Sequence, residues 1–346
     1  MRRRALLTAP ALLAAGPPPA RLVREVADAT GRRITLPGPV ARLFPAGPPA
    51  AILAYTVAPE VLLGWPSRPP RPTEAAFLEP GAAALPEVGR LTGRDDTASL
   101  EAVLAARADL VLDYGTVEPA YRQIAERVTA QTGIPMLLLD GALGAIPETY
   151  LLLGDILGRN AAAEERASAA NSILLSARQA AARLIGRRPR VYCAHGPRGL
   201  ETGVRGSVAT EILEFAGAEN VAVGPAGADG LAQVSMEQVL AWDPDWILTI
   251  DDAFMRHAQT DPLWQAMRAV REGRLVRAPS QPFDWVDFQP SVNRLLGLMW
   301  LPVLFGAVPA DGLAARVEAF HQLFYHRRPS GEQVRELLAS ALPSLR

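Results

Sequence analysis

The sequence predicts an α/β protein with two similar lobes, each a sheet covered by helices, joined by one long α-helix with a cleft between the lobes. Three observations predict this fold. Short apolar segments alternate with helical patterns, a stretch near the middle has the pattern of one uninterrupted helix, and a motif of the first half returns in the second half. Such alternation is typical of parallel sheets with helices on their faces.

Length and composition narrow the possible classes of protein. With 346 residues, 49% of them hydrophobic, the chain can form more than one core. Thirty-five Lys+Arg balance 36 Asp+Glu, and no basic block could follow a phosphate backbone, so we expect no nucleic-acid partner. Cys193 is the only cysteine, which excludes an internal disulfide and a multi-cysteine metal centre. We expect no cofactor and no metal bound by the protein itself.

The N-terminus has the pattern of a secretory signal. Arginines at positions 2–4 precede an apolar run over residues 5–15, which is too short to span a bilayer. No cysteine follows this run to carry a lipid anchor, and no later segment has the length and apolarity of a membrane span. We therefore expect a cleaved signal and a periplasmic location. The candidate cleavage sites follow Ala15, Gly16 and Ala20.

Six apolar segments have the composition of buried strands. The first five end in polar, aromatic or glycine residues, as expected where a strand delivers its last residue to a crevice. In the first half the predicted strands are Ala51–Tyr55, Leu110–Tyr114 and Met136–Asp140, and in the second half they are Arg190–Ala194, Trp246–Asp251 and Arg274–Ala278.

Residues 160–185 have the pattern of one long helix. Asn160 can cap its start, Glu164 and Glu165 suit its first turns, and Gly186 can end it. At 1.5 Å per residue such a helix is about 39 Å long, enough to lie along two small lobes. The predicted organisation is a signal over 1–20, an N-terminal lobe over 21–150, a bridging helical segment over 151–186 and a C-terminal lobe over 187–346.

An internal repeat supports two similarly built lobes. The motif SLEAVL at 99–104 returns as SMEQVL at 235–240, 136 residues later. The same offset relates Asp109 to Asp245 and the apolar runs LVL and WIL that follow them. A unit of helix, turn and strand therefore occurs once in each half.

These segments resemble the periplasmic binding proteins that deliver iron siderophores, haem and cobalamin to ABC importers. The matching text includes VGRLTGRDDTASLEAVLAARADLVLDYG, ATEILEFAGAENVA, VSMEQVLAWDPDWILTIDD and QPSVNRLLGLMWLPVLFG. The resemblance implies a monomer with a ligand cleft between its lobes and an ABC permease dimer of the inner membrane as its partner. Two departures are Ala108, where a proline is usual, and a proline-rich early segment.

Candidate ligand contacts lie in the loops that follow the strands of both lobes. Tyr55 and Tyr114 offer aromatic faces and hydroxyls at the ends of first-lobe strands. In the second lobe, His195 and Arg198 follow one strand and Asp251 ends the next. Arg198 is the preferred candidate, because a guanidinium binds carboxylate, catecholate and oxyanion groups through a planar fork.

Further candidates come from loops that the resemblance indicates. We expect one of Arg90 and Arg94 to face the cleft, and Arg294 to bind an anion at a helix start. Phe283 and Trp285, in an aromatic loop that ends at Phe288, could stack on a flat chelate. For Phe288 a place in the core is an equally good interpretation. The resemblance also implies that Glu101 and Glu237, paired by the repeat, dock into the two permease subunits.

No motif supports catalysis. The sequence lacks a P-loop, G-x-G-x-x-G, H-E-x-x-H and G-x-S-x-G. The favoured ligand is a ferric siderophore or related metal chelate, with haem, cobalamin and molybdate or tungstate as alternatives. A carrier of bare zinc or manganese would need more histidines than the four present. An alternative of another class is a cytoplasmic α/β enzyme whose N-terminus only mimics a signal.

Overall fold

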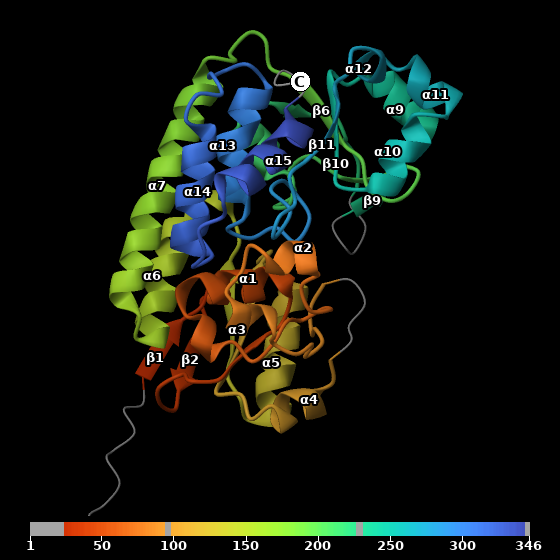
Figure 1. Ribbon diagram of the computed structural model, residues 1–346. Coiled ribbons are helices and arrows are strands. Elements are labelled where there is room, and N and C mark those ends of the chain that lie inside the picture. Colours follow the sequence, from red (N-terminus) through yellow and green to blue (C-terminus); the bar gives the residue numbers. More distant parts are fainter. Residues whose placement is uncertain (1–23, 94–97, 226–230, 343–346) are drawn as a thin grey trace, which may run out of the picture.

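The computed structural model describes residues 24–93, 98–225 and 231–342 (Figure 1). The predicted signal segment and Arg94 lie outside these residues. The strands are β1 (Arg24–Ala27), β2 (Arg33–Leu36), β3 (Leu43–Pro45), β4 (Leu110–Gly115), β5 (Met136–Asp140), β6 (Arg190–Cys193), β7 (Glu201–Gly203), β8 (Glu219–Asn220), β9 (Leu231–Gln233), β10 (Trp246–Thr249) and β11 (Leu275–Arg277).

Helices connect these strands and close the C-terminal part of the chain. The α-helices of the first half are α1 (Pro48–Val57), α2 (Pro72–Ala75), α3 (Pro80–Ala83), α4 (Leu100–Ala105), α5 (Pro119–Thr132) and α6 (Ile146–Leu157), followed by α7 (Asn160–Ala182). Those of the second half are α8 (Glu211–Phe215), α9 (Met236–Trp242), α10 (Asp252–Ala258), α11 (Pro262–Ala266), α12 (Arg268–Arg271), α13 (Arg294–Leu304), α14 (Leu313–Phe324) and α15 (Gly331–Ala341). Short 3-10 turns cover Pro59–Val61 and Leu143–Ala145.

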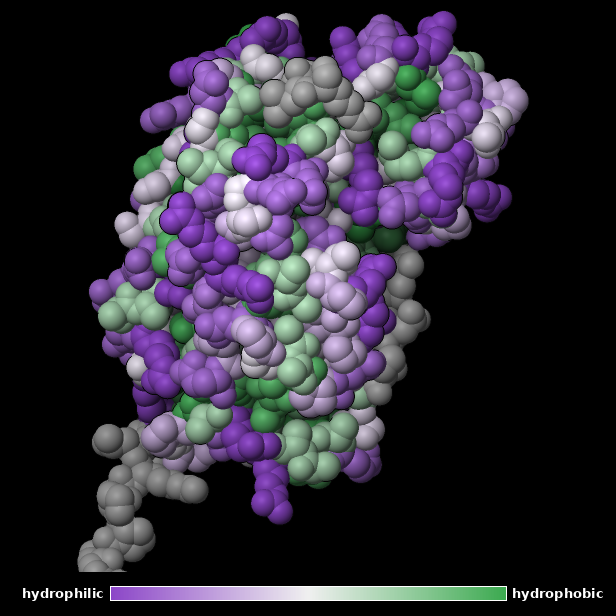
Figure 2. Space-filling model, viewed as in Figure 1, coloured by the Kyte–Doolittle hydropathy of each residue, from purple (hydrophilic) through white to green (hydrophobic). Residues whose placement is uncertain are grey.

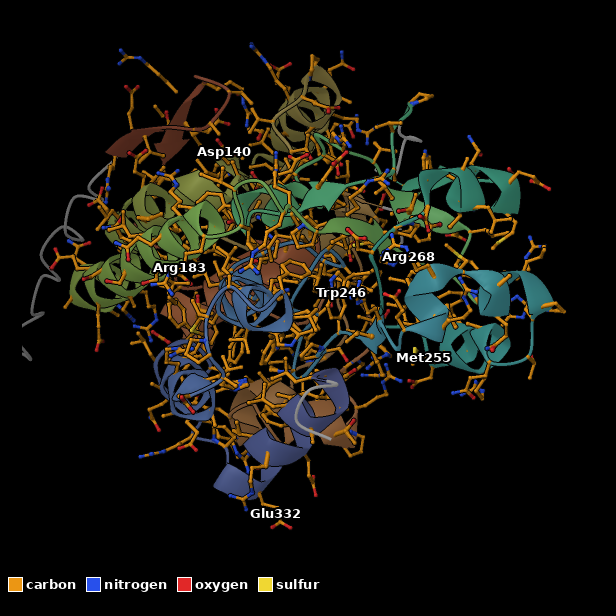
Figure 3. The ribbon with its side chains drawn as sticks, turned by 90° about the horizontal axis from the view of Figure 1, so that it is seen from above. Asp140, Arg183, Trp246, Met255, Arg268 and Glu332 are labelled. Carbon is orange, nitrogen blue, oxygen red and sulfur yellow. The ribbon has the colours of Figure 1, made fainter. Side chains whose placement is uncertain are left out.

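Two parallel sheets form the framework. The first has the strand order β3-β4-β5 and the second the order β11-β10-β6-β8. From above, Trp246 of β10 lies between the α7 side, marked by Arg183, and the α10–α12 side, marked by Met255 and Arg268 (Figure 3). The predicted α/β class is confirmed, with one parallel sheet from each half of the sequence.

One predicted strand is wrong. Residues 51–55 belong to α1, and the first strand of the sheet is β3 instead. Pro48 and Pro49 occupy the first positions of this helix, where proline is tolerated, and residues 50–57 are all buried. Because every face of α1 is apolar, periodicity cannot distinguish it from a buried strand. Tyr55 is therefore a core residue of a helix and does not end a strand.

The long helix predicted over residues 160–185 is present as α7 over Asn160–Ala182. Asn160 is its first residue and Arg159 holds the cap position, without a side-chain cap. After Ala182 the chain forms a turn that reaches Gly186, whose φ of +85° suits glycine. The helix packs against α6 and α13 and stands along one side of the molecule (Figure 1).

The repeat seen in the sequence is a repeat of structure. Each copy begins with a serine that caps a helix, Ser99 for α4 and Ser235 for α9, and each helix leads to an inner strand of its sheet, β4 or β10. Asp109 accepts backbone N–H bonds from Ala41 and Arg42, while Asp245 accepts one from Arg190. The strand order β3-β4-β5 thus corresponds to β6-β10-β11.

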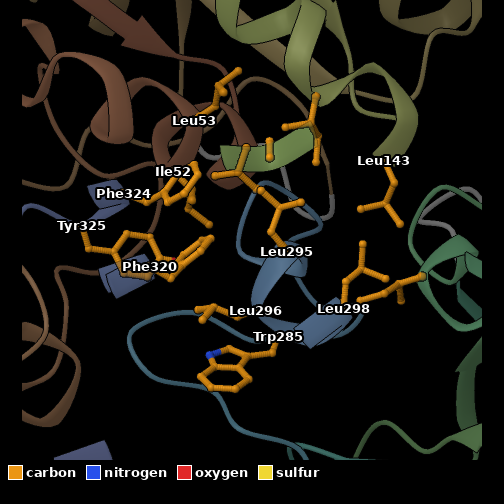
Figure 4. Packing of buried hydrophobic residues seen from close by; sticks show 14 of the residues in the cluster. Ile52, Leu53, Leu143, Trp285, Leu295, Leu296, Leu298, Phe320, Phe324 and Tyr325 are labelled. Atoms are coloured by element: carbon orange, nitrogen blue, oxygen red, sulfur yellow. The ribbon is translucent and has the colours of Figure 1, made fainter. Parts of the chain in front are cut away.

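The largest hydrophobic core joins the two halves. Ile52 and Leu143 from the first half pack in one cluster with Leu295 and Phe324 from the C-terminal helices (Figure 4). The Tyr55 hydroxyl donates to the backbone oxygen of Tyr325 at 2.6 Å. The C-terminal end of α14 is therefore anchored on α1. No helix among the described residues has both the length and the apolarity required to cross a membrane.

Candidate ligand-binding site

Arg294 begins α13 as predicted, but its guanidinium is buried in the protein, with 0% exposure. It donates to the backbone oxygens of Ser291, Val208 and Gly141 and to Glu211 Oε1, the last at 2.9 Å. A buried guanidinium is tolerated only when its donors are satisfied, and here Nε and both Nη atoms have acceptors. Arg294 therefore links the end of β5 to α8 and is enclosed by the protein, so it is not open to a ligand.

Other hydrogen bonds also cross between the halves near this link. The backbone N–H of Leu143 donates to Glu211 Oε1 at 2.6 Å, and Ser291 Oγ donates to the backbone oxygen of Pro49 at 2.8 Å. The strand-end loops of the first half consequently meet α8 and the start of α13.

The side chain of Tyr114 lies in the core and is not exposed at the surface. It is 1% exposed, and burial raises the pKa of its phenol to about 12, against the opposing effect of the nearby Arg294 guanidinium. The next residue, Gly115, lies so close to Gly141 that a Cβ on Gly141 would stand 2.5 Å from the Gly115 Cα. The carboxyl ends of β4 and β5 therefore meet through the backbone of Gly115 and Gly141, without side chains between them.

His195 forms the centre of a buried charged cluster in the second half. Its Nε2 lies 2.8 Å from Asp287 Oδ2. Burial alone lowers the pKa of His195, but the carboxylates of Asp287 and Asp284 outweigh it and raise that pKa to about 9. Burial, followed by the charge of Asp287, raises the pKa of Asp284 to about 7. The thiol of Cys193 is buried beside this cluster, and burial raises its pKa as well.

The His195–Asp287 bond holds together two loops with exposed side chains. Arg198 is exposed three residues after His195, and Phe288, next to Asp287, is 48% exposed. Arg198 was predicted as a ligand contact, whereas for Phe288 the sequence left surface and core equally open. The aromatic count of the loop gave no signal for which ring would be exposed. This pair offers a cation and an aromatic face.

The two aromatic candidates of that loop face inward. Trp285 is fully buried, and its indole N–H donates to the backbone oxygen of Gln281 at 3.2 Å. The Phe283 ring lies 5.8 Å from the Trp65 ring and 5.6 Å from the Tyr325 ring, so it joins the core cluster. Both rings therefore pack in the core and anchor the loop there, and neither is exposed to stack on a ligand.

The remaining candidates that the structure describes, Asp251 and Arg90, are partly buried and bonded within the protein. Asp251 caps α10 and accepts the backbone N–H of Ala253 at 2.7 Å and that of Phe254 at 3.3 Å. Arg90 is half-buried, and its backbone oxygen accepts the N–H of Ala98. Among the described residues, no group of three His, Cys, Asp or Glu side chains could hold a metal ion.

The molecular surface is uneven near these loops. The α10–α12 region projects beyond the first half, and hydrophobic side chains are visible beneath it (Figure 2). A separate hollow of about 560 Å³ lies between α7 and α14 and is lined by residues such as Arg166, Gln322 and His326. Its walls are α7, α14 and the segment that follows α14, and no strand-end loop lines it.

Comparison with known proteins identifies the family. The model of the family described as "Periplasmic binding protein" matches residues 76–282. The chain therefore belongs to the periplasmic binding protein family. It is the solute-binding component of an ABC importer and not an enzyme. No curated protein matches the sequence.

Solved structures share the fold over nearly the whole chain. An ABC transporter solute-binding protein from Sulfurospirillum deleyianum is 26% identical, with a TM-score of 0.82 over 91% of this chain and 99% of that one. A periplasmic solute-binding protein from Veillonella parvula is 21% identical, with a TM-score of 0.71 over 91% and 96%. A molybdate-binding periplasmic protein from Haemophilus influenzae is 18% identical, with a TM-score of 0.70 over 89% and 99%.

Proposed function

We propose that this protein is exported to the periplasm, where it binds an anionic metal chelate, such as a ferric siderophore, between two lobes and delivers it to an ABC permease dimer. One observation carries the choice of site. The His195–Asp287 bond joins the loop of Arg198 to the loop of Phe288, so a cation and an exposed ring stand on two loops held together. A chelate with acidic groups and a flat apolar face suits this pair.

Molybdate or tungstate is the second candidate. The Haemophilus influenzae protein of similar fold binds molybdate, and an oxyanion would use Arg198 without needing a ring. Haem and cobalamin are further chelates of the same general shape. The two classes of ligand differ in their demand on Phe288, which gives the experiment its discriminating power.

The test is a titration of purified protein, followed by intrinsic tryptophan fluorescence, with a ferric siderophore, haem, cobalamin and molybdate. Trp65 and Trp285 lie next to or within the 283–288 loop and serve as reporters. For a chelate, Arg198→Ala and Phe288→Ala should each weaken binding about tenfold or more, equivalent to about 1.4 kcal/mol. For an oxyanion only Arg198→Ala should do so.

Leu263→Ala on α11 is the matched control, because Leu263 is 50% exposed yet lies outside these loops. It should bind like the unmodified protein. If folded protein responds to none of the ligands, and native mass spectrometry of the purified sample finds no co-purified chelate, the ligand class is wrong.

We further propose that α7 connects the two lobes and limits their closure. It is one 23-residue helix packed against α6 and α13, and the Arg294 link also joins the halves. Such a connection resists hinge bending. Small-angle scattering should therefore give nearly the same radius of gyration with and without ligand, and a large decrease would contradict this.

The glutamates Glu101 and Glu237 are proposed as the permease contacts. Both are exposed in the first turns of capped helices, one in each half. Replacing both with alanine should abolish uptake and leave ligand binding intact. Export itself is tested by cell fractionation and N-terminal sequencing of the mature protein, since cytosolic protein with an uncleaved N-terminus would contradict it.

A further inference from the structure

The two helices of the internal repeat expose the same three residues. On α4 these are Glu101, Leu104 and Ala105, and on α9 they are Glu237, Leu240 and Ala241, each pair separated by 136 residues. Within each helix the three occupy positions i, i+3 and i+4, which lie on one helix face. All six residues are exposed.

The structure presents this face in the same way in both halves. Val103 and Val239, at equivalent positions, are fully buried and fix the rotation of each helix. Just after each helix, at equivalent positions, a non-glycine residue has a positive φ, Arg107 at 49° and Asp243 at 39°. Both helices lie at the periphery of the molecule, α4 at the lower end and α9 at the upper right (Figure 1).

Packing within the chain does not account for the shared face. Leu104 is 47% exposed and Leu240 is 38% exposed, so neither is held by a core. Positions beside the face have diverged, since Ala102 corresponds to Gln238 and Ala106 to Trp242. In both copies a leucine is exposed to solvent at the same position, next to the same carboxylate. This arrangement is typical of a surface that contacts another molecule.

We propose that each face is a docking patch in which the leucine enters a shallow apolar hollow of the partner, the small alanine allows close approach, and the glutamate pairs with a cation at the rim. Because the two patches are equivalent, the partner offers the same surface twice and is a two-fold symmetric membrane protein. This rests on the proposed function and adds an apolar anchor to the glutamate contacts. Apolar contacts that exclude water from an ion pair raise its contribution to affinity.

The experiment measures binding of ligand-free, fluorescently labelled protein to membranes of the native host. Leu104→Ser with Leu240→Ser should weaken binding at least tenfold, and each single substitution should weaken it severalfold. Matched controls are Leu175→Ser on α7 and Leu263→Ser on α11, both 50% exposed and without an apolar counterpart at the repeat offset. They should change binding less than twofold.

The outcomes separate this inference from the proposed function. If the glutamate double variant loses binding while the leucine double variant keeps it, the apolar anchor is wrong and the function stands. If the unmodified protein does not bind the membranes, both fail. Photo-crosslinkers at positions 104 and 240 should label the same membrane polypeptide, and labelling of two different polypeptides would overturn the two-fold partner. Thermal unfolding of each variant checks that the fold is retained.

Discussion

The two halves of this protein share a scaffold and differ at their strand ends. Both place a serine-capped helix before an inner strand of a parallel sheet. At the edge of the first sheet lie glycine backbone and the buried carboxyl of Asp113, whereas the second half carries the His195–Asp287 pair and the exposed Arg198. The two halves thus share the parts that form the sheets and differ in the loops at the strand ends.

The link between the halves should show the largest effect on stability. Arg294→Met leaves the Glu211 carboxylate without its cation and three backbone oxygens without this donor, so it should lower the free energy of unfolding by about 3–5 kcal/mol. Arg328→Met, which removes the exposed pair with Glu318, should cost at most about 1 kcal/mol. Urea denaturation measures both.

A second variant keeps this test informative. Adding Glu211→Leu to Arg294→Met removes the unpaired charge and should restore part of the lost stability. If Arg294→Met proves no more harmful than Arg328→Met, the halves are not held by this link.

Two buried groups, His195 in the second half and Asp113 in the first, should titrate in different pH ranges. The folded pKa of His195 is raised to about 9, so its stabilising contribution is complete below pH 6.5 and is lost as the pH rises through 9. Stability should therefore fall by up to about 1.4 kcal/mol per pH unit between pH 7 and 9. His195→Gln should remove this slope, and His257→Gln should not.

The first half should respond at lower pH. Burial raises the pKa of Asp113 to about 6, so the folded protein binds this proton more tightly than the unfolded chain between about pH 4 and 6. Stability should fall as the pH rises through that range, where Asp284 contributes a slope of the same sign, and Asp113→Asn should reduce the slope there and leave it unchanged above pH 7. Denaturation at a series of pH values measures both slopes, and a slope above pH 7 that depends on Asp113 would contradict the assignment.

The aspartates of the repeat should matter about equally. Asp109→Ala removes two backbone hydrogen bonds beside β3, and Asp245→Ala removes one beside β6 together with the ion pair to Arg268. Each should cost about 1–3 kcal/mol, because backbone donors are left without a partner. Since the sites are far apart, the double variant should show the sum of the two losses.

The smallest predicted effect comes from the helix caps. Ser99→Ala and Ser235→Ala should each lower stability by about 1 kcal/mol, since each removes an acceptor for a backbone N–H of the first turn. Ser172→Ala, in the middle of α7, provides the control and should cost less. A difference of several kcal/mol between the two caps would show that the repeat helices are not equivalent.

The sequence predicted the scaffold well where the pattern had a single interpretation. The strands β4 and β5, the helix α7 and the repeat were all placed closely, because strand length, an uninterrupted helical composition and a fixed offset are local signals. The segment 51–55 failed because a helix buried on every side has no periodicity. The candidate site was harder, since an aromatic or arginine in a loop has the same local sequence signal whether it is buried or exposed.

By itself, the sequence determined the class of fold, the duplicated unit and the chemistry available in the loops. Tertiary structure alone decided which side chains remain accessible: Arg294 and Trp285 became internal, while Arg198 and Phe288 stayed at the surface. The physical reason is that burial depends on contacts between segments far apart in the chain. The acceptors that hold Arg294 lie up to 153 residues away, beyond the reach of any local pattern.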